Sequence, residues 1–157
     1  MKNSHTNASG VALVEVVLGV AIAGIVVAMI AFTFGLFVSA SNRAVEETQA
    51  LYLAEEGLEI LTHLRDTDWD ILETDLAVDT TYYLSVATTA LDTTITPEVI
   101  DGKFTRSFRL SEVERNGNDD IVSSGSVDDG IRFVTMSVEW GTEEVALTSL
   151  LANLHEE

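Results

Sequence analysis

The chain has 157 residues, which leaves room for one long helix and one modest domain. Its formal net charge is −18, so it repels nucleic-acid phosphates and anionic lipid, and nucleic-acid binding is excluded as the expected function. Cysteine is absent, which excludes thiol chemistry and disulfide bonds and means that the domain folds on core packing alone.

The first expected element is a helix that spans a membrane. Residues 16–38 carry no charge, and Thr33 is their only polar side chain. Because about 20 apolar residues are enough to cross a bilayer, we expect a transmembrane helix over residues 11–40. Lys2 and the chain's own amino terminus are positive, so the positive-inside rule predicts a single-pass precursor with its amino terminus inside.

A single acid, Glu15, lies near the start of this apolar run, and it is the only acid before residue 46. A carboxylate at membrane depth costs about 2.5 kcal/mol or more, so an intramembrane acid indicates a functional role. Gly10 ends a short polar leader, residues 1–10, and this pattern predicts a cut between Gly10 and Val11. The new ammonium at Val11 would lie one helical turn from Glu15. Because burial costs each ion several kcal/mol, we expect this pair to set subunit register rather than to add large net stability.

Small residues are frequent in the same run, and they let helices approach closely in lipid. We therefore expect this helix to pack against neighbouring subunits. The small residues are Gly19, Gly24, Gly35, Ala21, Ala23, Ala28 and Ala31.

The stretch from Gly10 to Leu18, Gly-Val-Ala-Leu-Val-Glu-Val-Val-Leu, resembles the amino-terminal signature of the type IV pilin-like family. That family includes pilins and the pseudopilins of type II secretion. The resemblance implies cleavage after Gly10 by a prepilin peptidase, N-methylation of Val11 and a role for Glu15 in subunit assembly. No proline interrupts the apolar run, and Gln49 to Glu59 resembles a segment common in minor pilins, so a minor pilin or pseudopilin is favoured.

The resemblance also implies partners and a location. The partners are the prepilin peptidase, other pilin subunits, an inner-membrane assembly platform and membrane lipid. The precursor would lie in the cytoplasmic membrane and then join a filament at the cell surface or in the periplasm. Two alternatives stay open: an unprocessed single-span receptor or binding module, and an exported protein cut near Ala40, where small residues fit a signal-peptidase site loosely.

Beyond Arg43 the helical pattern becomes amphipathic and continues to about Arg65. Its apolar residues recur at three- and four-residue spacing: Val45, Leu51, Ala54, Leu58, Leu61 and Leu64. Gly57 lies within this pattern, and a glycine there costs about 0.8–1 kcal/mol relative to alanine. We therefore expect a strand to approach the helix closely at Gly57.

The remaining residues predict antiparallel strands at 81–87, 104–110, 131–140 and 145–154. In the third of these, alternation places one set on a common face: Arg132, Val134, Met136, Val138 and Trp140. Asn116-Gly117 predicts a turn, and Gly141-Thr142 predicts a hairpin between the last two strands. Residues 92–102 and 116–130 are expected to be long polar loops.

The predicted fold is α+β, in which a long amino-terminal helix packs on a small antiparallel sheet of three to four strands. The first half of the helix is transmembrane and the second half amphipathic. The expected organisation is a leader at 1–10, a transmembrane and filament-core helix at 11–40, and the amphipathic half-helix with an acidic, β-rich head at 41–157.

No enzymatic or cofactor site is expected. Asp66, Asp68 and Asp70 alternate as in calcium loops, but Ile71 stands where glycine is required, so we expect a helix end and a turn. Calcium binding stays open for one acidic loop, which contains Asn118, Asp119, Asp120, Asp128 and Asp129. The three histidines, His5, His63 and His155, are too scattered for a zinc site.

Overall fold

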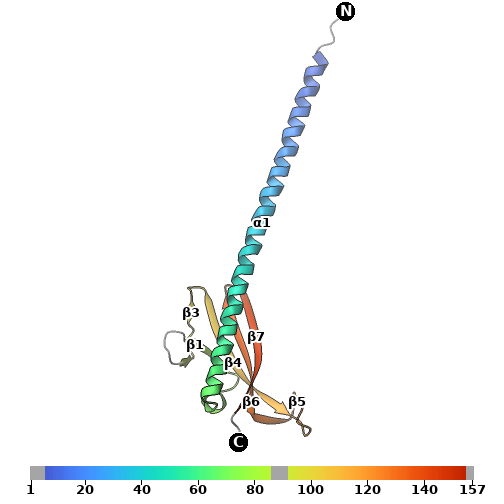
Figure 1. The fold of residues 1–157 in the computed structure, drawn as a ribbon. Helices are drawn as coiled ribbons and strands as arrows, with labels where there is room; N and C mark the ends of the chain where they lie inside the picture. The colour runs from blue at the N-terminus through green and yellow to red at the C-terminus, as the bar shows by residue number, and fades with distance from the viewer. Residues whose placement is uncertain (1–5, 86–91, 155–157) are drawn as a thin grey trace, which may run out of the picture. The chain divides into compact units, whose positions relative to one another are not determined.

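The computed structural model describes residues 6–85 and 92–154, with side chains placed for residues 11–84 and 95–154 (Figure 1). The chain divides into two compact units, Met1–Val45 and Glu46–Glu157, and each is described by itself. Helix α1 (Thr6–Thr67) contributes residues to both units.

In the amino-terminal unit, α1 is apolar on all sides from Val11 to Val38 apart from Glu15 and Thr33. Every placed side chain of this stretch is exposed. A Cβ added to Gly19, Gly24 or Gly35 would meet nothing within 4 Å. The helix is long and apolar enough to cross a membrane.

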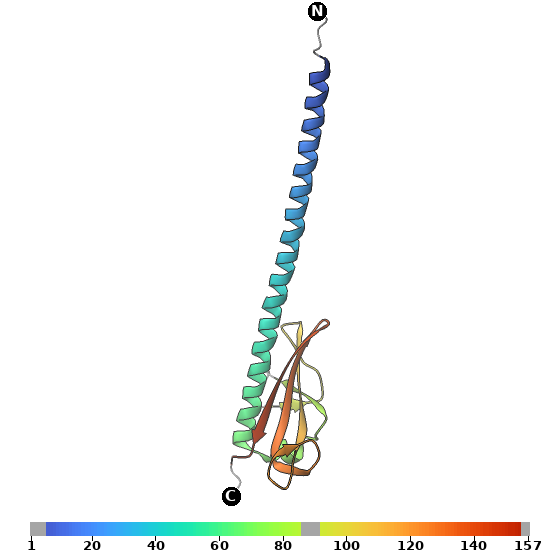
Figure 2. The same cartoon turned by 90° about the vertical axis from the view of Figure 1, so that its right-hand side faces the viewer.

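In the carboxy-terminal unit, residues 46–67 of α1 lie along one face of the sheet (Figure 2). The helix residues buried against the sheet recur at helical spacing: Ala50, Ala54, Gly57, Leu61 and Leu64. The amphipathic half-helix is therefore confirmed, and it ends two residues later than expected, at Thr67. Of its expected apolar set, Val45 and Leu51 are exposed, and Ala50 is buried instead.

After α1 the chain turns into a short π-helix, η1 (Ile71–Asp75). The backbone N–H of Asp70 donates to Asp68 Oδ1 at 3.2 Å, so this aspartate stabilises the turn. Trp69 and Leu72 are buried in the core on either side of Asp70. The prediction that the alternating aspartates mark a helix end and a turn is confirmed.

The sheet contains seven strands among the described residues, and all of its pairings are antiparallel. The longer strands are β1 (Thr81–Ser85), β4 (Phe104–Arg115), β6 (Ser126–Trp140) and β7 (Glu143–Ala152). The short strands are β2 (Asp92–Thr94), β3 (Val99–Ile100) and β5 (Ile121–Val122). The order is β2-β1-β4-β6-β7, and β3 and β5 also pair with β4 (Figure 1).

The predicted α+β fold is confirmed, and its four expected strands correspond to β1, β4, β6 and β7. Residues 86 and 87 of the first expected strand lie outside the described residues. The expectation of two strandless loops was wrong. The loop at 92–102 contains β2 and β3, and the one at 116–130 contains β5 and the start of β6.

The core lies between α1 and the inner face of the sheet. Strand β6 buries the predicted set, from Arg132 to Trp140 at every second residue, and β4 buries Phe104, Phe108 and Leu110. A Cβ at Gly57 would lie 2.7 Å from Met136 Sδ and 3.1 Å from Arg106 Cδ. The close approach expected at Gly57 is therefore confirmed.

Candidate functional site

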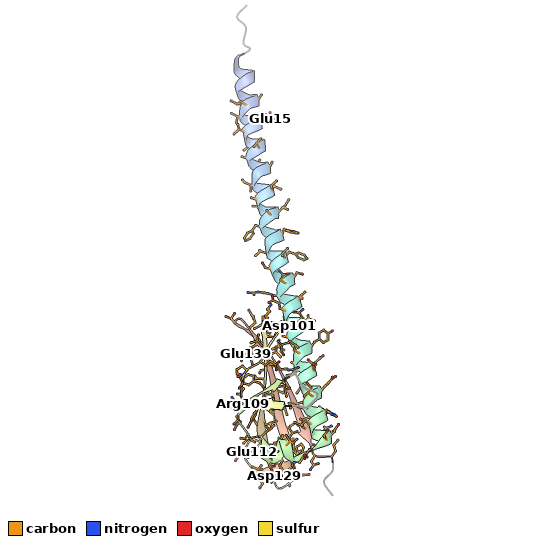
Figure 3. All side chains as sticks on the ribbon, turned by 90° about the vertical axis from the view of Figure 1, so that its left-hand side faces the viewer. Glu15, Asp101, Arg109, Glu112, Asp129 and Glu139 are labelled. Carbon is orange, nitrogen blue, oxygen red and sulfur yellow. The ribbon has the colours of Figure 1, made fainter. Side chains whose placement is uncertain are left out.

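The residues of the predicted processing and assembly site share one helix. Helix α1 begins at Thr6, so Gly10, Val11 and Glu15 all have helical backbone, and Val11 and Glu15 are exposed (Figure 3). Residues separated by four positions lie one above the other on a helix. Glu15 is therefore on the same side as Val11, one turn further along.

The helical period also assigns the small residues to faces, which the sequence reasoning did not do. Ala12, Gly19 and Ala23 share a face with Glu15 because their spacings are three or four residues. A neighbouring backbone can approach such a face closely, and the carboxylate lies at its edge. A second small-residue face follows further along, made of Gly24, Ala28, Ala31 and Gly35.

A buried arginine joins α1 to the sheet in the carboxy-terminal unit. Arg106 on β4 is 1% exposed, and its Nη1 donates to the Leu53 carbonyl at 3.0 Å and to Glu56 Oε2 at 2.9 Å. Its Nε and Nη2 have no partner among the described residues. Gly57 leaves the space beside α1 in which the Arg106 stem lies.

The sequence reasoning missed Arg106. The signal that identifies it is its position in the strand, because Arg106 lies two residues from each of Phe104 and Phe108, and alternate residues of a strand share one face. An arginine on the same face of the strand as two buried phenylalanines points inward, toward the half-helix and its acids.

The acidic loop considered for calcium is held by internal bonds. Arg115 Nε donates to Asp128 Oδ2 at 2.5 Å, and its Nη1 donates to the Asp119 carbonyl at 2.6 Å. The hydrogen bond that Arg115 donates to the Asp128 carboxylate raises the pKa of Arg115. In the described part of the chain, no group of three His, Cys, Asp or Glu residues could hold a metal ion.

The outer face of the sheet carries a shallow polar hollow of about 430 Å³. Its main lining residues are on β1, β4 and β6: Thr81, Tyr83, Thr105, Ser107, Arg109, Thr135, Ser137 and Glu139. Arg109 Nη2 donates to Thr81 Oγ1 at 3.2 Å, and Figure 3 shows Arg109 and Glu139 on the side away from α1.

No known protein family, curated protein or solved structure matches the chain. In the structure, a long apolar helix continues into an amphipathic half that packs on an antiparallel sheet. This architecture is consistent with a pilin-like fold.

Proposed function

We propose that the protein is a structural subunit, a minor pilin or pseudopilin, of a type IV pilus-like filament. It enters the cytoplasmic membrane as a prepilin with its amino terminus inside, is cut after Gly10 and polymerises through α1. Its partners are the prepilin peptidase, other pilin subunits, the inner-membrane assembly platform and membrane lipid. Its role is that of a structural component of the filament and not of an enzyme.

One observation carries the proposal: α1 exposes an apolar surface from Val11 to Val38 that contains a single acid. Such a surface requires lipid or other apolar helices around it. Lipid alone does not require a carboxylate, whereas a neighbouring chain with a free ammonium at Val11 does, because the two charges neutralise each other away from water.

The helical start of α1 adds a step to processing. Because Gly10 has helical backbone, we expect the first turn to open before the peptide bond after Gly10 is cut. Glycine in a helix interior costs about 0.8–1 kcal/mol relative to alanine, so Gly10 makes local opening easier. After the cut, Val11 begins the helix, and Glu15 lies near its positive end, where a carboxylate is favoured.

The acidity of the carboxy-terminal unit favours a sparse subunit. The whole chain carries 26 acids against 8 lysines and arginines, and like-charged units repel when crowded. A main building block would place many such units side by side. A subunit placed at intervals among other subunits avoids this electrostatic repulsion between neighbouring acidic units.

Intact mass spectrometry of the membrane-bound protein from its native cells tests the proposal. A chain that begins at Val11, with or without one added methyl group, is the expected result. Gly10→Val should retain the leader, because a branched side chain replaces the residue at the cut, and Gly19→Ala should be processed normally. Retention of Met1 in the wild-type protein would contradict the proposal and favour an unprocessed membrane-anchored binding module. A chain that begins after Ala40 would favour an exported domain.

A further inference from the structure

Strand β7 forms a long edge of the sheet. The sheet order ends at β7, and β7 pairs with β6 from Glu143 to Ala152 without a register shift. Among the described residues, no group bonds to the outer edge of β7. An antiparallel ladder directs every second N–H and C=O outward, so this edge presents a row of unpaired backbone donors and acceptors.

The residues of β7 do little to prevent pairing with another strand. Charges, prolines and bulges normally protect an edge, yet from Val145 to Leu154 there is no charge and no proline. The only charges of β7 are Glu143 and Glu144 at its start. Its inward residues Val145 and Leu147 are only partly buried against the core, so apolar surface remains at this edge.

The outer face beside this edge is also partly apolar. Leu150 is 48% exposed, and it lies directly across from Phe133 of β6, which is 37% exposed. A further strand with an apolar residue opposite Leu150 would extend this pair into a row of three.

Charge and length decide which strand fits. An acidic segment would be repelled by a chain of net charge −18, so the partner strand must be free of acids over most of its paired length. At the other end of the described sheet, β2 has only three residues and cannot match an edge of ten. The β7 strand of a second copy meets both requirements, since it has ten residues and is uncharged from Val145 to Ala152.

We propose that β7 pairs with β7 of a second copy, antiparallel and centred at Thr148, to form a continuous sheet across two chains. In this register Glu144 lies opposite Ala152 of the second copy, and Ala146 lies opposite its Leu150. The two Glu144 residues are then about 27 Å apart along the strands, well beyond the screening length of about 8 Å at physiological salt. A parallel pairing would place the acids side by side.

A two-fold contact has a consequence for assembly. All subunits of a polar filament point the same way, so an antiparallel, self-complementary contact does not propagate within one filament. It joins carboxy-terminal units from different filaments. The inference does not depend on processing at Gly10 or on the role of Glu15.

Cysteine cross-linking tests the register, because the wild-type chain has no cysteine. The full chain in detergent carries Thr148→Cys, Glu144→Cys or Thr135→Cys and is oxidised under mild conditions. Thr148→Cys should form disulfide-linked dimers about tenfold faster than either of the others, because only its two copies come within disulfide range. Thr135 is the matched control, since it lies beside Thr148 in the register but on β6. Equal rates at the three positions would overturn the proposal, even if the chain dimerises through α1.

A charge placed on the edge provides the second test. Chains with Ala146→Cys are mixed with chains with Leu150→Cys, and the mixed disulfide is measured. Adding Thr148→Lys to both should reduce its yield about tenfold, because two ammonium groups then face each other. Adding Thr135→Lys should not reduce it. Higher salt should increase pairing of the unmodified edge, since the contact contains no ion pair and the chains repel. An unchanged yield with Thr148→Lys would contradict the pairing.

Discussion

At Gly57 a missing Cβ lets α1 approach the sheet. The position of a Cβ there would be 2.7 Å from Met136 Sδ and 2.8 Å from Met136 Cε, closer than side chains tolerate. The approach brings the Leu53 carbonyl and Glu56 to the buried guanidinium of Arg106. One glycine thus permits both the apolar packing of the helix–sheet interface and the ion pair between buried Arg106 and half-exposed Glu56.

We expect Gly57→Ala to destabilise the carboxy-terminal unit by about 1–2 kcal/mol, because overpacking outweighs the gain in helix propensity. Thermal unfolding of the detergent-solubilised chain, followed by circular dichroism, measures the change. Met136→Ala should reduce the cost of Gly57→Ala, because the new methyl group then fills part of the vacated space. Gly24→Ala, at an open helical position, is the matched control and should not lower the midpoint. Additive effects of Gly57→Ala and Met136→Ala would show that the two residues do not crowd each other.

A second prediction at the scale of single residues concerns the carboxylate of Glu15. We expect Glu15→Ala to leave the cut after Gly10 intact and to abolish incorporation into filaments, because the ammonium of Val11 then has no partner away from water. The measurement compares sheared filaments with the membrane fraction by immunoblot, and intact mass reports the cut. Glu47→Ala, at another exposed acid of α1, is the control and should be incorporated normally. Normal incorporation of Glu15→Ala would refute the role proposed for this carboxylate.

At the scale of elements, the sequence predicts those whose periodicity extends over many residues. Helix α1 and strands β4 and β6 each repeat their apolar pattern several times, so their existence and buried faces could be read directly. Strands β2, β3 and β5 have two or three residues, too few to show alternation, and the polar sequence around them resembles a loop.

The start of β6 could not be predicted for a different reason. The β4–β6 register shifts between Glu112 and Val113, and beyond the shift Val113 pairs with Asp128. Strand β6 therefore extends back through Asp128, Asp129 and Gly130, a sequence typical of turns. Arg115 stabilises this extension by its ion pair with Asp128, and such a pairing between distant residues is not visible in local sequence.

The candidate site could be proposed from the sequence alone, because its chemistry is local. Gly10, Val11 and Glu15 lie within six residues, and the apolar run around them establishes the unusual position of the acid. The faces on which the small residues lie follow once a straight helix is known to continue from Thr6. Arg106 required tertiary information, since its partners lie about 50 positions earlier in the chain.

At the scale of the whole molecule, the net charge of −18 opposes compaction and association alike. The five ion pairs in the described residues involve four of the eight lysines and arginines, namely Arg65, Lys103, Arg106 and Arg115, with Arg115 contacting two acids. The solvent-exposed pairs among them contribute about 0–1 kcal/mol each and weaken with salt. Salt therefore has two opposite effects on stability, and the excess of acids decides which is larger.

We expect stability to rise with salt, because screening of the repulsion among many acids outweighs the weakening of a few ion pairs. Raising the ionic strength from 0.1 to 1 M shortens the screening length from about 10 to about 3 Å, which removes most repulsion between exposed carboxylates. The thermal midpoint of the detergent-solubilised chain should rise by about 4–8 °C for each kcal/mol gained. Sodium and potassium chloride should act equally if the effect is screening, whereas a difference between them would indicate a specific cation site. A midpoint that falls with either salt would mean that the ion pairs, led by Arg106–Glu56 and Arg115–Asp128, contribute more to stability than the acids remove.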